Sequence, residues 1–337
     1  LAGLLPTGVV KVVWSFTLAR TLLSAVELGI FGALELADKD ASTLAEELAC
    51  DPSAMEVLLA ALSGFGMLRR RGGVYSLPRE ARRYLTKASG TDLSAALELG
   101  ALLDRRFQRL TEVVRTGRHE DFHGSLSADE WGAYLRGLGA LATPTAKEVA
   151  RVLPLKHARR GLDIGGGHGR FSSALCDRHA TLTMEVLDLP GAVAVGESLV
   201  ATSSSSDRVR YRAGDLRETH LGEGLDVVLL FNVLHNLAEQ DARRAVSRAV
   251  AALRPGGLVA ILEGQHRGGD GNLSFQEAFG ELFFLVLSGS RTWAEPILRR
   301  WLDDAGADIV KRKRLFTLPG AVLLLARRGR GDEHAPP

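Results

Sequence analysis

The first third of the chain carries apolar residues at helical spacing. Residues 12–37 are rich in leucine and alanine, which predicts one or two helices that end at the charged run 38–40. Two more helical segments follow; Ser42 is expected to cap the first, and Pro52 suits the first turn of the second. The stretch 64–77 then predicts a turn and a short hairpin. Helix, helix and hairpin together indicate a winged-helix unit.

A different pattern begins at residue 161, after a largely helical stretch at 91–150. Short apolar runs alternate with helical segments, which is typical of parallel strands joined by crossover helices. Near the C-terminus, two apolar runs flank a Pro-Gly turn and predict a closing antiparallel hairpin. We therefore expect an α/β fold with a doubly wound sheet behind a mostly helical N-terminal domain. The expected strands are 161–164, 183–187, 209–213, 225–231 and 258–262, with the hairpin at 309–318 and 322–326.

Composition excludes several classes of partner. Hydrophobic residues make up 46% and charged residues 24% of the 337 residues, as in ordinary folded soluble proteins. The formal net charge is only +2, so no sequence-wide field draws the chain to nucleic acid or anionic lipid. The two cysteines, Cys50 and Cys176, form neither a disulfide framework nor a zinc-binding spacing. We expect a cytoplasmic protein with no metal, nucleic-acid or membrane partner.

The apolar stretch 9–36 resembles a membrane span or a signal peptide at first sight. Charged residues interrupt it, a small-residue cleavage pattern is lacking, and its apolar positions recur with helical period. We expect a buried or subunit-facing helix instead. The interrupting residues are Lys11, Arg20, Glu27 and Glu35.

A glycine-rich turn follows the first strand of the second half, within residues 162–170. Glycines let a ligand approach the backbone, and the helix that follows offers unpaired amides, although a purely structural turn has the same pattern. Asp188 ends the next strand, where a carboxylate can accept both ribose hydroxyls. Asp215 follows the third strand, where it can meet an adenine amino group while Leu216 covers the ring. Each acid alone could be a solvated turn residue or a helix cap, but together they indicate an adenosine ligand.

The form of the turn favours S-adenosylmethionine (SAM) over a dinucleotide. Arg170 stands where a dinucleotide site has its third glycine. Asp163, just before the turn, would repel a pyrophosphate, whereas it suits the ammonium and sulfonium charges of SAM. The expected cofactor-binding residues are Asp163, Gly165, Gly166, Gly167, Asp188, Leu189, Gly214, Asp215 and Leu216.

With these motifs the chain resembles, over nearly its whole length, the two-domain SAM-dependent O-methyltransferases of the caffeic acid, hydroxyindole and bacterial polyketide-tailoring type. The resemblance implies a Rossmann-like cofactor domain and an N-terminal domain that forms an intertwined homodimer and roofs the substrate pocket. The implied parts are 1–100 for dimerisation, 101–150 as linker and roof, 151–328 for SAM, and a disordered tail at 329–337. The matching segments are the helix end at 25–31, the winged helix, Leu-Asp-Ile-Gly-Gly-Gly-His-Gly at 162–169, Asp-Leu-Pro at 188–190, Gly-Asp-Leu at 214–216 and Leu-Arg-Pro-Gly-Gly at 253–257.

The same resemblance implies a general base. His235 occupies the position of the family's base, and Glu263 that of the carboxylate that orients it. The alternatives are a structural histidine and an acid on an exposed loop. Phe231 and Asn232 fall near the methionine end of SAM, which is released as S-adenosylhomocysteine after transfer. Three aromatic residues, which could equally belong to the core, are expected to contact a small, planar aromatic acceptor: Trp131, Phe279 and Phe283.

The chain departs from the family pattern at three places. Ser290 stands where an acid usually precedes Arg-Thr, Phe231 replaces a frequent lysine, and Asn236 replaces an aspartate after the histidine. These changes leave open a SAM-binding relative that catalyses hydroxylation, decarboxylation or rearrangement. A winged-helix transcription regulator is a further alternative, because the arginines at 69–71 could reach phosphates. Against it, the helix at 53–62 has almost no side chains that donate to base edges.

Overall fold

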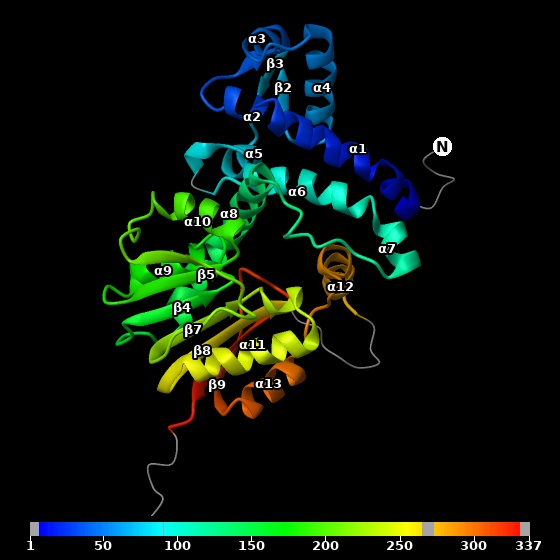
Figure 1. Cartoon of the computed structure of the whole chain (residues 1–337). Coiled ribbons are helices and arrows are strands. Elements are labelled where there is room, and N and C mark those ends of the chain that lie inside the picture. The colour runs from blue at the N-terminus through cyan, green and yellow to red at the C-terminus, as the bar shows by residue number, and fades with distance from the viewer. Residues whose placement is uncertain (1–6, 90, 265–272, 331–337) are drawn as a thin grey trace, which may run out of the picture. The chain divides into compact units, whose positions relative to one another are not determined.

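The computed structural model describes residues 7–89, 91–264 and 273–330. They belong to two compact units, Leu1–Asp104 and Arg105–Pro337, and each unit has a core of its own (Figure 1). Most of the tail expected at 329–337 lies outside the described residues. Within the described ranges, every helix falls short of a membrane span in length or in apolar character.

The N-terminal unit is the expected winged helix with additional helices. Asp40 pairs with Val74 in a three-stranded sheet of order β1-β3-β2. The expected cap at Ser42 is wrong, because the helix begins one residue after β1 and the Asp40 carboxylate accepts the Thr43 N–H at 2.8 Å. The elements are α1 Thr7–Glu27, α2 Ile30–Ala33, β1 Lys39–Asp40, α3 Ala41–Glu47, α4 Pro52–Gly64, β2 Arg69–Arg71, β3 Val74–Ser76, α5 Arg79–Tyr84, η1 Lys87–Ser89 and α6 Ser94–Phe107, whose last residues belong to the second unit.

The second unit contains a seven-stranded sheet of order β6-β5-β4-β7-β8-β10-β9. The first five of these strands are parallel, and β10 runs antiparallel to both of its neighbours, which confirms the α/β fold with a closing hairpin. One strand begins earlier than expected, because Leu253 already pairs with Leu225 before a shift in register. The strands are β4 Arg160–Ile164, β5 Thr183–Asp188, β6 Val209–Ala213, β7 Leu225–Phe231, β8 Leu253–Gly264, β9 Ala307–Arg314 and β10 Ala321–Arg328.

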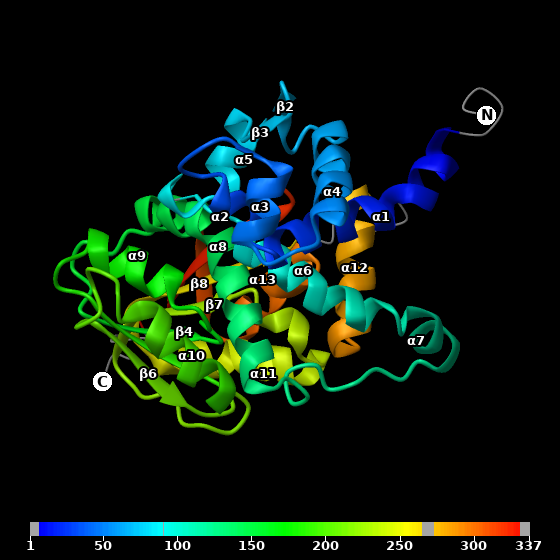
Figure 2. The same cartoon turned by 90° about the horizontal axis from the view of Figure 1, so that it is seen from above.

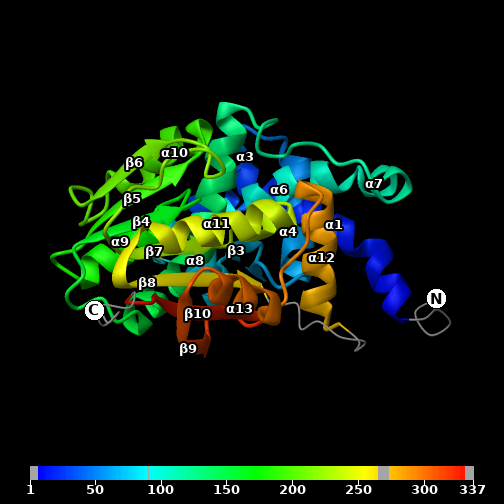
Figure 3. The same cartoon turned by 60° about the horizontal axis from the view of Figure 1, so that its bottom comes forward.

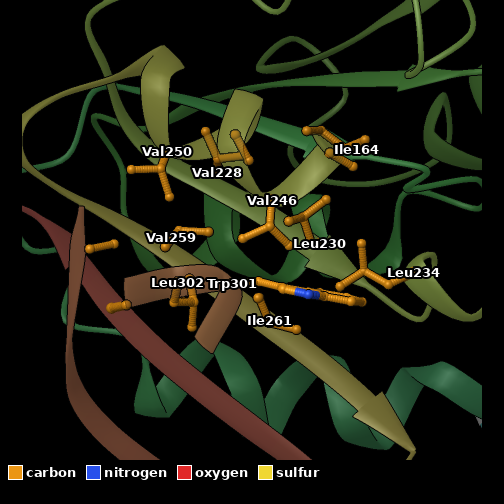
Figure 4. Packing of buried hydrophobic residues seen from close by; sticks show 14 of the residues in the cluster. Ile164, Val228, Leu230, Leu234, Val246, Val250, Val259, Ile261, Trp301 and Leu302 are labelled. Atoms are coloured by element: carbon orange, nitrogen blue, oxygen red, sulfur yellow. The ribbon is translucent and has the colours of Figure 1, made fainter. Parts of the chain in front are cut away.

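Helices cover both faces of this sheet (Figures 1 and 3). On one face α11 and α13 pack on the strands through Val246, Val250, Trp301 and Leu302, as Figure 4 shows. On the other face α8 and α9 contribute to a second cluster of buried residues. The helices of this unit are α7 Leu110–Thr116, α8 Ala128–Val152, α9 Arg170–Arg178, α10 Pro190–Val200, η2 Leu234–Asn236, α11 Glu239–Ala252, α12 Phe275–Ser288 and α13 Glu295–Asp304.

The topology brings the expected site residues to one edge. The parallel strands β4, β5, β7 and β8 end at the same side of the sheet, and each is followed by one of the turns singled out in the sequence. Ligands of open α/β sheets bind at that side, where loops are free to present side chains. The site is therefore built from the residues at these four strand ends and from those that follow the parallel strand β6.

Candidate active site

The glycine turn after β4 is held in place by a carboxylate and by close packing. Asp188 accepts the Gly167 N–H at 2.8 Å and the Leu189 N–H at 2.7 Å, one on each carboxylate oxygen. Gly165 has a φ of 69°, and a Cβ there would lie 2.5 Å from a methyl carbon of Val233. Glycine is thus required at this position by both backbone conformation and space. The glycine turn and the turn after β7 are therefore in direct contact.

Asp163 places an unpaired charge beneath this turn. Its side chain is 1% exposed; one carboxylate oxygen accepts the Ser172 hydroxyl at 2.7 Å, and the other, Oδ1, has no hydrogen-bond partner among the residues that the structure describes. Burial raises the pKa of Asp163 to about 7, against the opposing effect of the Ser172 hydrogen bond. A buried carboxylate oxygen without a partner is costly, and a cation would remove that cost. The glycine turn, which side chains would fill, and this oxygen together fit SAM.

The other predicted adenosine contacts are partly engaged with the protein itself. Asp188 lies half-buried, and burial raises its pKa to about 6 despite its two backbone hydrogen bonds. Gly214 lies beside it, donating its N–H to the Asp188 backbone carbonyl at 2.9 Å. In contrast, both carboxylate oxygens of Asp215 accept the Nε–H of Arg217 at 3.0 Å. This side-chain hydrogen bond is the main cause of the lowered pKa of Asp215. Leu216 is half-buried against the core cluster.

A histidine and a glutamate meet at the ends of β7 and β8. His235 Nδ1 lies 2.6 Å from Oε2 of Glu263, whose side chain is fully buried. The other oxygen of Glu263, Oε1, accepts the backbone N–H groups of Val233 at 3.1 Å and Leu234 at 2.8 Å. The Phe284 ring stacks on the imidazole at a centroid distance of 3.8 Å. An ionised carboxylate can only accept hydrogen bonds, so Oε2 accepts from Nδ1 of His235. The proton of neutral His235 therefore lies on Nδ1, and Nε2 is left as the acceptor.

The two residues at the end of β7 differ in placement. Phe231 is buried and lies edge-to-face on Phe171 at 4.9 Å, so its ring contributes to the core. Asn232 is exposed and has a φ of 52°, a left-handed conformation that asparagine tolerates better than most residues. Of this pair, Asn232 therefore offers a polar side chain beside the glycine turn.

The expected acceptor contacts lie on two helices of the second unit. Trp131 of α8 is buried, and a Cβ on Gly191, just beyond Asp188, would collide with its indole ring. On α12, Phe279 is 49% exposed, and both Phe279 and Phe283 pack on Phe107, at centroid distances of 6.2 and 5.9 Å. These aromatic faces flank the residues at the strand ends.

Two residues near this site, Trp293 and His123, have no signal in the sequence, whereas Ser290 is marked only by its departure from the family pattern. Trp293 donates its Nε1–H to the Leu234 carbonyl at 2.8 Å and so fixes the turn that carries His235. Ser290, which replaces the usual acid, donates its hydroxyl to the Leu237 carbonyl at 2.9 Å. A second histidine, His123, lies on the segment between α7 and α8. These positions are distant in sequence from the motifs, so only the folded chain shows their relation to the site.

Comparison with known proteins identifies the family. The sequence pattern of a family described as the O-methyltransferase domain matches residues 107–306. This chain belongs to that family. A second pattern, the O-methyltransferase dimerisation domain, matches residues 10–87 and supports a homodimer.

Individual relatives of this O-methyltransferase agree with the assignment. A 3-hydroxy-5-methyl-1-naphthoate 3-O-methyltransferase from Streptomyces sahachiroi is 30% identical, covering 90% of this chain and 89% of that enzyme. A mitomycin biosynthesis 6-O-methyltransferase from Streptomyces lavendulae is 25% identical, over 86% and 85%. Human N-acetylserotonin methyltransferase in complex with SAM shares the fold, with a TM-score of 0.83 and 22% identity over 95% of this chain and 96% of that chain. The chain is an O-methyltransferase, and SAM is its cofactor.

Proposed function

We propose that this O-methyltransferase transfers a methyl group to a hydroxyl of a small aromatic or polyketide-like natural product, with His235 as general base. The observation that carries the proposal is the short contact between His235 and the buried Glu263, which leaves Nε2 unprotonated beside the cofactor turn. An imidazole held in this way is suited to receive the proton of an acceptor hydroxyl.

The acceptor class rests on relatives and on side chains. Related enzymes act, by name, in tetracenomycin polyketide synthesis, on a hydroxynaphthoate and in mitomycin biosynthesis. In this chain Phe279, half exposed beside Phe283, offers an aromatic face to a planar molecule, and Trp131 lies near the cofactor strand. Offset stacking on such faces favours flat ring systems. A fused aromatic acceptor with at least one phenolic hydroxyl fits this set.

Cofactor binding would use residues at four strand ends. The glycine turn from Gly165 to Gly167 would admit SAM, with Asp188 on the ribose hydroxyls and Asp163 opposite its positive charges. Leu189, Gly214 and Leu216 would line the nucleoside, and Asp215 would share its carboxylate between Arg217 and the adenine amino group. Asn232 would lie toward the methionine end, whereas Phe231 would support the strand from the core. SAM, when bound, supplies the methyl group and leaves as S-adenosylhomocysteine.

The proton transfer would use His235 and Glu263 only. The acceptor hydroxyl would give its proton to Nε2 of His235, and its oxygen would keep the electron pair that forms the new bond to carbon. The imidazolium so formed would be stabilised by the Glu263 carboxylate, since Nδ1–H already points at Oε2. Glu263 acts through His235 and is therefore a positioning residue.

Replacement of His235 by alanine tests the base. We expect His235→Ala to lower turnover about 10²- to 10⁴-fold, because positioned proton removal contributes that much, and to leave the Kd for SAM within about twofold. Single-turnover methyl transfer from labelled SAM to a panel of phenols measures the first, and calorimetry the second. His157→Ala, at an exposed histidine, is the matched control. A fully active His235→Ala enzyme would refute the base and favour a SAM-dependent reaction that needs none.

A further inference from the structure

The segment between α7 and α8 passes close to the base. It runs between the two helices (Figure 2), with a turn at residues 122–125, and carries His119 against the C-terminal end of α12, where a Cβ on Gly289 would collide with the imidazole. The neighbouring Ser288 donates its hydroxyl to the His235 carbonyl at 3.3 Å. One end of this segment is therefore fixed beside the turn that holds the base.

The other end of the segment is fixed beside the cofactor strand. The His123 ring stacks on Trp131 at 5.7 Å with an interplanar angle of 26°, and Phe122 packs edge-on against His123 at 5.2 Å. Trp131 lies against Gly191, on the helix that follows Asp188. This second anchor places the His123 ring on Trp131, one of the residues expected to contact the acceptor.

Hydrogen bonding fixes which nitrogen of His123 carries the proton. Within the described part of the chain, the only hydrogen-bond partner of the Tyr134 hydroxyl is Nε2 of His123, at 3.3 Å. Burial, and then the charge of Asp188, raise the pKa of Tyr134, so this hydroxyl keeps its proton and needs an acceptor. A neutral imidazole that accepts at Nε2 carries its proton at Nδ1. That Nδ1–H has no partner among the described residues.

The ring is also neutral under ordinary conditions. Burial lowers the pKa of His123 to about 4; Asp121 acts in the opposite direction, and the nearby His235 lowers it further. A neutral N–H donor near the base can bind an oxygen without competing for the acceptor's proton.

We propose that His123 is a specificity-determining residue whose Nδ1–H donates a hydrogen bond to a second oxygen of the acceptor, a carbonyl or carboxylate oxygen on the ring system that carries the methylated hydroxyl. The inference rests on the proposed function, since it assigns a substrate feature to the same site. It divides acceptor recognition between the aromatic faces, which select a flat molecule, and one donor, which sets its orientation toward His235.

Three acceptors that differ in one substituent test the donor. The acceptors are 2-naphthol, 3-hydroxy-1-naphthoate and 1-acetyl-3-hydroxynaphthalene, which share the naphthalene ring and the hydroxyl. The first has no second oxygen, the second carries a carboxylate, and the third carries a ketone carbonyl. His123→Phe keeps the stack on Trp131 but removes the donor. We expect it to raise KM about tenfold for the acceptors with the second oxygen, which corresponds to about 1.4 kcal/mol, while kcat changes by less than twofold. For 2-naphthol neither constant should change, and the group with the larger KM effect shows which oxygen is preferred.

Two further variants separate a donor from a structural ring. His123→Asn, whose amide N–H can take the place of Nδ1–H, should recover most of the lost affinity. Tyr134→Phe removes the hydroxyl that keeps the His123 proton on Nδ1, so the ring can adopt either tautomer. It should change KM in the same direction as His123→Phe but by less. Equal KM increases for all three acceptors, or no increase for any, would overturn the proposal.

Failure of the proposed function would appear separately, as a wild-type enzyme that transfers no methyl group to any of the three acceptors. In that case, calorimetric Kd values for the same molecules in the presence of S-adenosylhomocysteine test whether His123 donates a hydrogen bond to the second oxygen. A loss in His123→Phe that is confined to the two acceptors with a second oxygen supports the proposal, and equal Kd values in wild type and variant overturn it.

Discussion

At the scale of single residues, the hydrogen bonds of Glu263 determine how a glutamine at this position would act on His235. Oε1 accepts two backbone N–H groups and Oε2 faces Nδ1 of His235. In a glutamine, the amide oxygen is held by the two backbone donors, so the NH₂ group faces the imidazole. His235 must then accept at Nδ1 and carry its proton on Nε2, where the base function is lost.

We therefore expect Glu263→Gln to lower turnover nearly as far as His235→Ala, about 10²-fold or more, with little change in SAM affinity. Rapid-quench single-turnover rates measure the effect. Glu263→Asp, which remains ionised, should retain more activity than the glutamine variant. An equally active glutamine variant would show that tautomer control does not limit the reaction.

If Asp163 faces the cofactor as proposed, we expect cofactor binding and stability to respond to pH in opposite directions. The pKa of about 7 in the folded chain exceeds the usual 3.8, so the folded state binds this proton more tightly than the unfolded state does. The resulting stability is fully present below the unfolded pKa and is lost as pH rises through about 7. A cationic cofactor, in contrast, prefers the ionised form that dominates at higher pH.

For Asp163→Asn we expect the cofactor-free protein at pH 8 to gain on the order of 1–3 kcal/mol in free energy of unfolding, because the buried charge is removed. Its SAM affinity should fall, and the weakening of SAM binding in wild type between pH 8 and 6, by up to about tenfold per unit, should become smaller. Urea unfolding and calorimetry at several pH values measure both. A variant less stable than wild type at pH 8 would contradict the assigned cost of burial.

The sequence identifies residues of this kind unevenly. Asp163 and Asp188 are predictable because Asp163 lies next to the end of β4 and Asp188 ends β5, each within a local motif. The ion pair between Asp215 and Arg217 and the core position of Phe231 depend on side-chain packing, which periodicity does not report. His123 is not predictable from a local motif or from periodicity, since its environment comes from Trp131 and Tyr134 of α8.

At the scale of elements, the glycine turn after β4 and the turn after β7 form one packed unit. Gly165 contacts Val233, the residue whose N–H is bound by Glu263, so a shift of either turn disturbs the other. Gly165→Ala adds a Cβ into this contact and places a side chain on a left-handed φ of 69°.

We expect Gly165→Ala to weaken SAM binding at least tenfold and to lower turnover beyond the loss in binding, because His235 moves with Val233. Gly222→Ala is the matched control for backbone strain alone, since its φ is 82° and no atom lies within 4 Å of its added Cβ. Gly165→Ala combined with Val233→Ala should regain part of the activity. Identical behaviour of the two glycine variants would rule out the contact as the cause.

Elements were predictable where one period dominates. The apolar run of β7 is buried at every position except the partly buried Asp226, and it appears in the sequence as a nearly continuous hydrophobic stretch. The start of β8 was misplaced because Arg254, Pro255 and two glycines interrupt its apolar run, although Leu253 still pairs with β7. The cap of α3 was misplaced because Asp40 belongs to both a strand and a helix boundary.

At the scale of the whole molecule, α1 leaves apolar side chains exposed. Phe16 is 68% and Leu18 42% exposed in the single chain, within the segment that matches the dimerisation domain. Large exposed apolar side chains commonly mark subunit contacts. They agree with the homodimer that this domain supports.

We expect light scattering at micromolar concentration to report a dimer for the wild-type chain, and Phe16→Ser to shift it toward monomer with reduced thermal stability, because dimer interfaces of this type contribute to folding. Phe316→Ser, at a 92% exposed phenylalanine of the second unit, is the control. A wild-type protein that remains a folded monomer would contradict the assembly.

The position of β10 bears on how the chain is made. Glu263 lies opposite Val322, so β8 receives its second neighbour only when the ribosome has added β10. Until then its buried residues 258–262 form an apolar strand with one unpaired edge, a template for pairing with other nascent chains. The strand that carries Glu263, the proposed positioning residue, is thus most exposed to misassociation during translation of the last helices. A chain terminated in that interval would carry the whole cofactor turn on an open sheet.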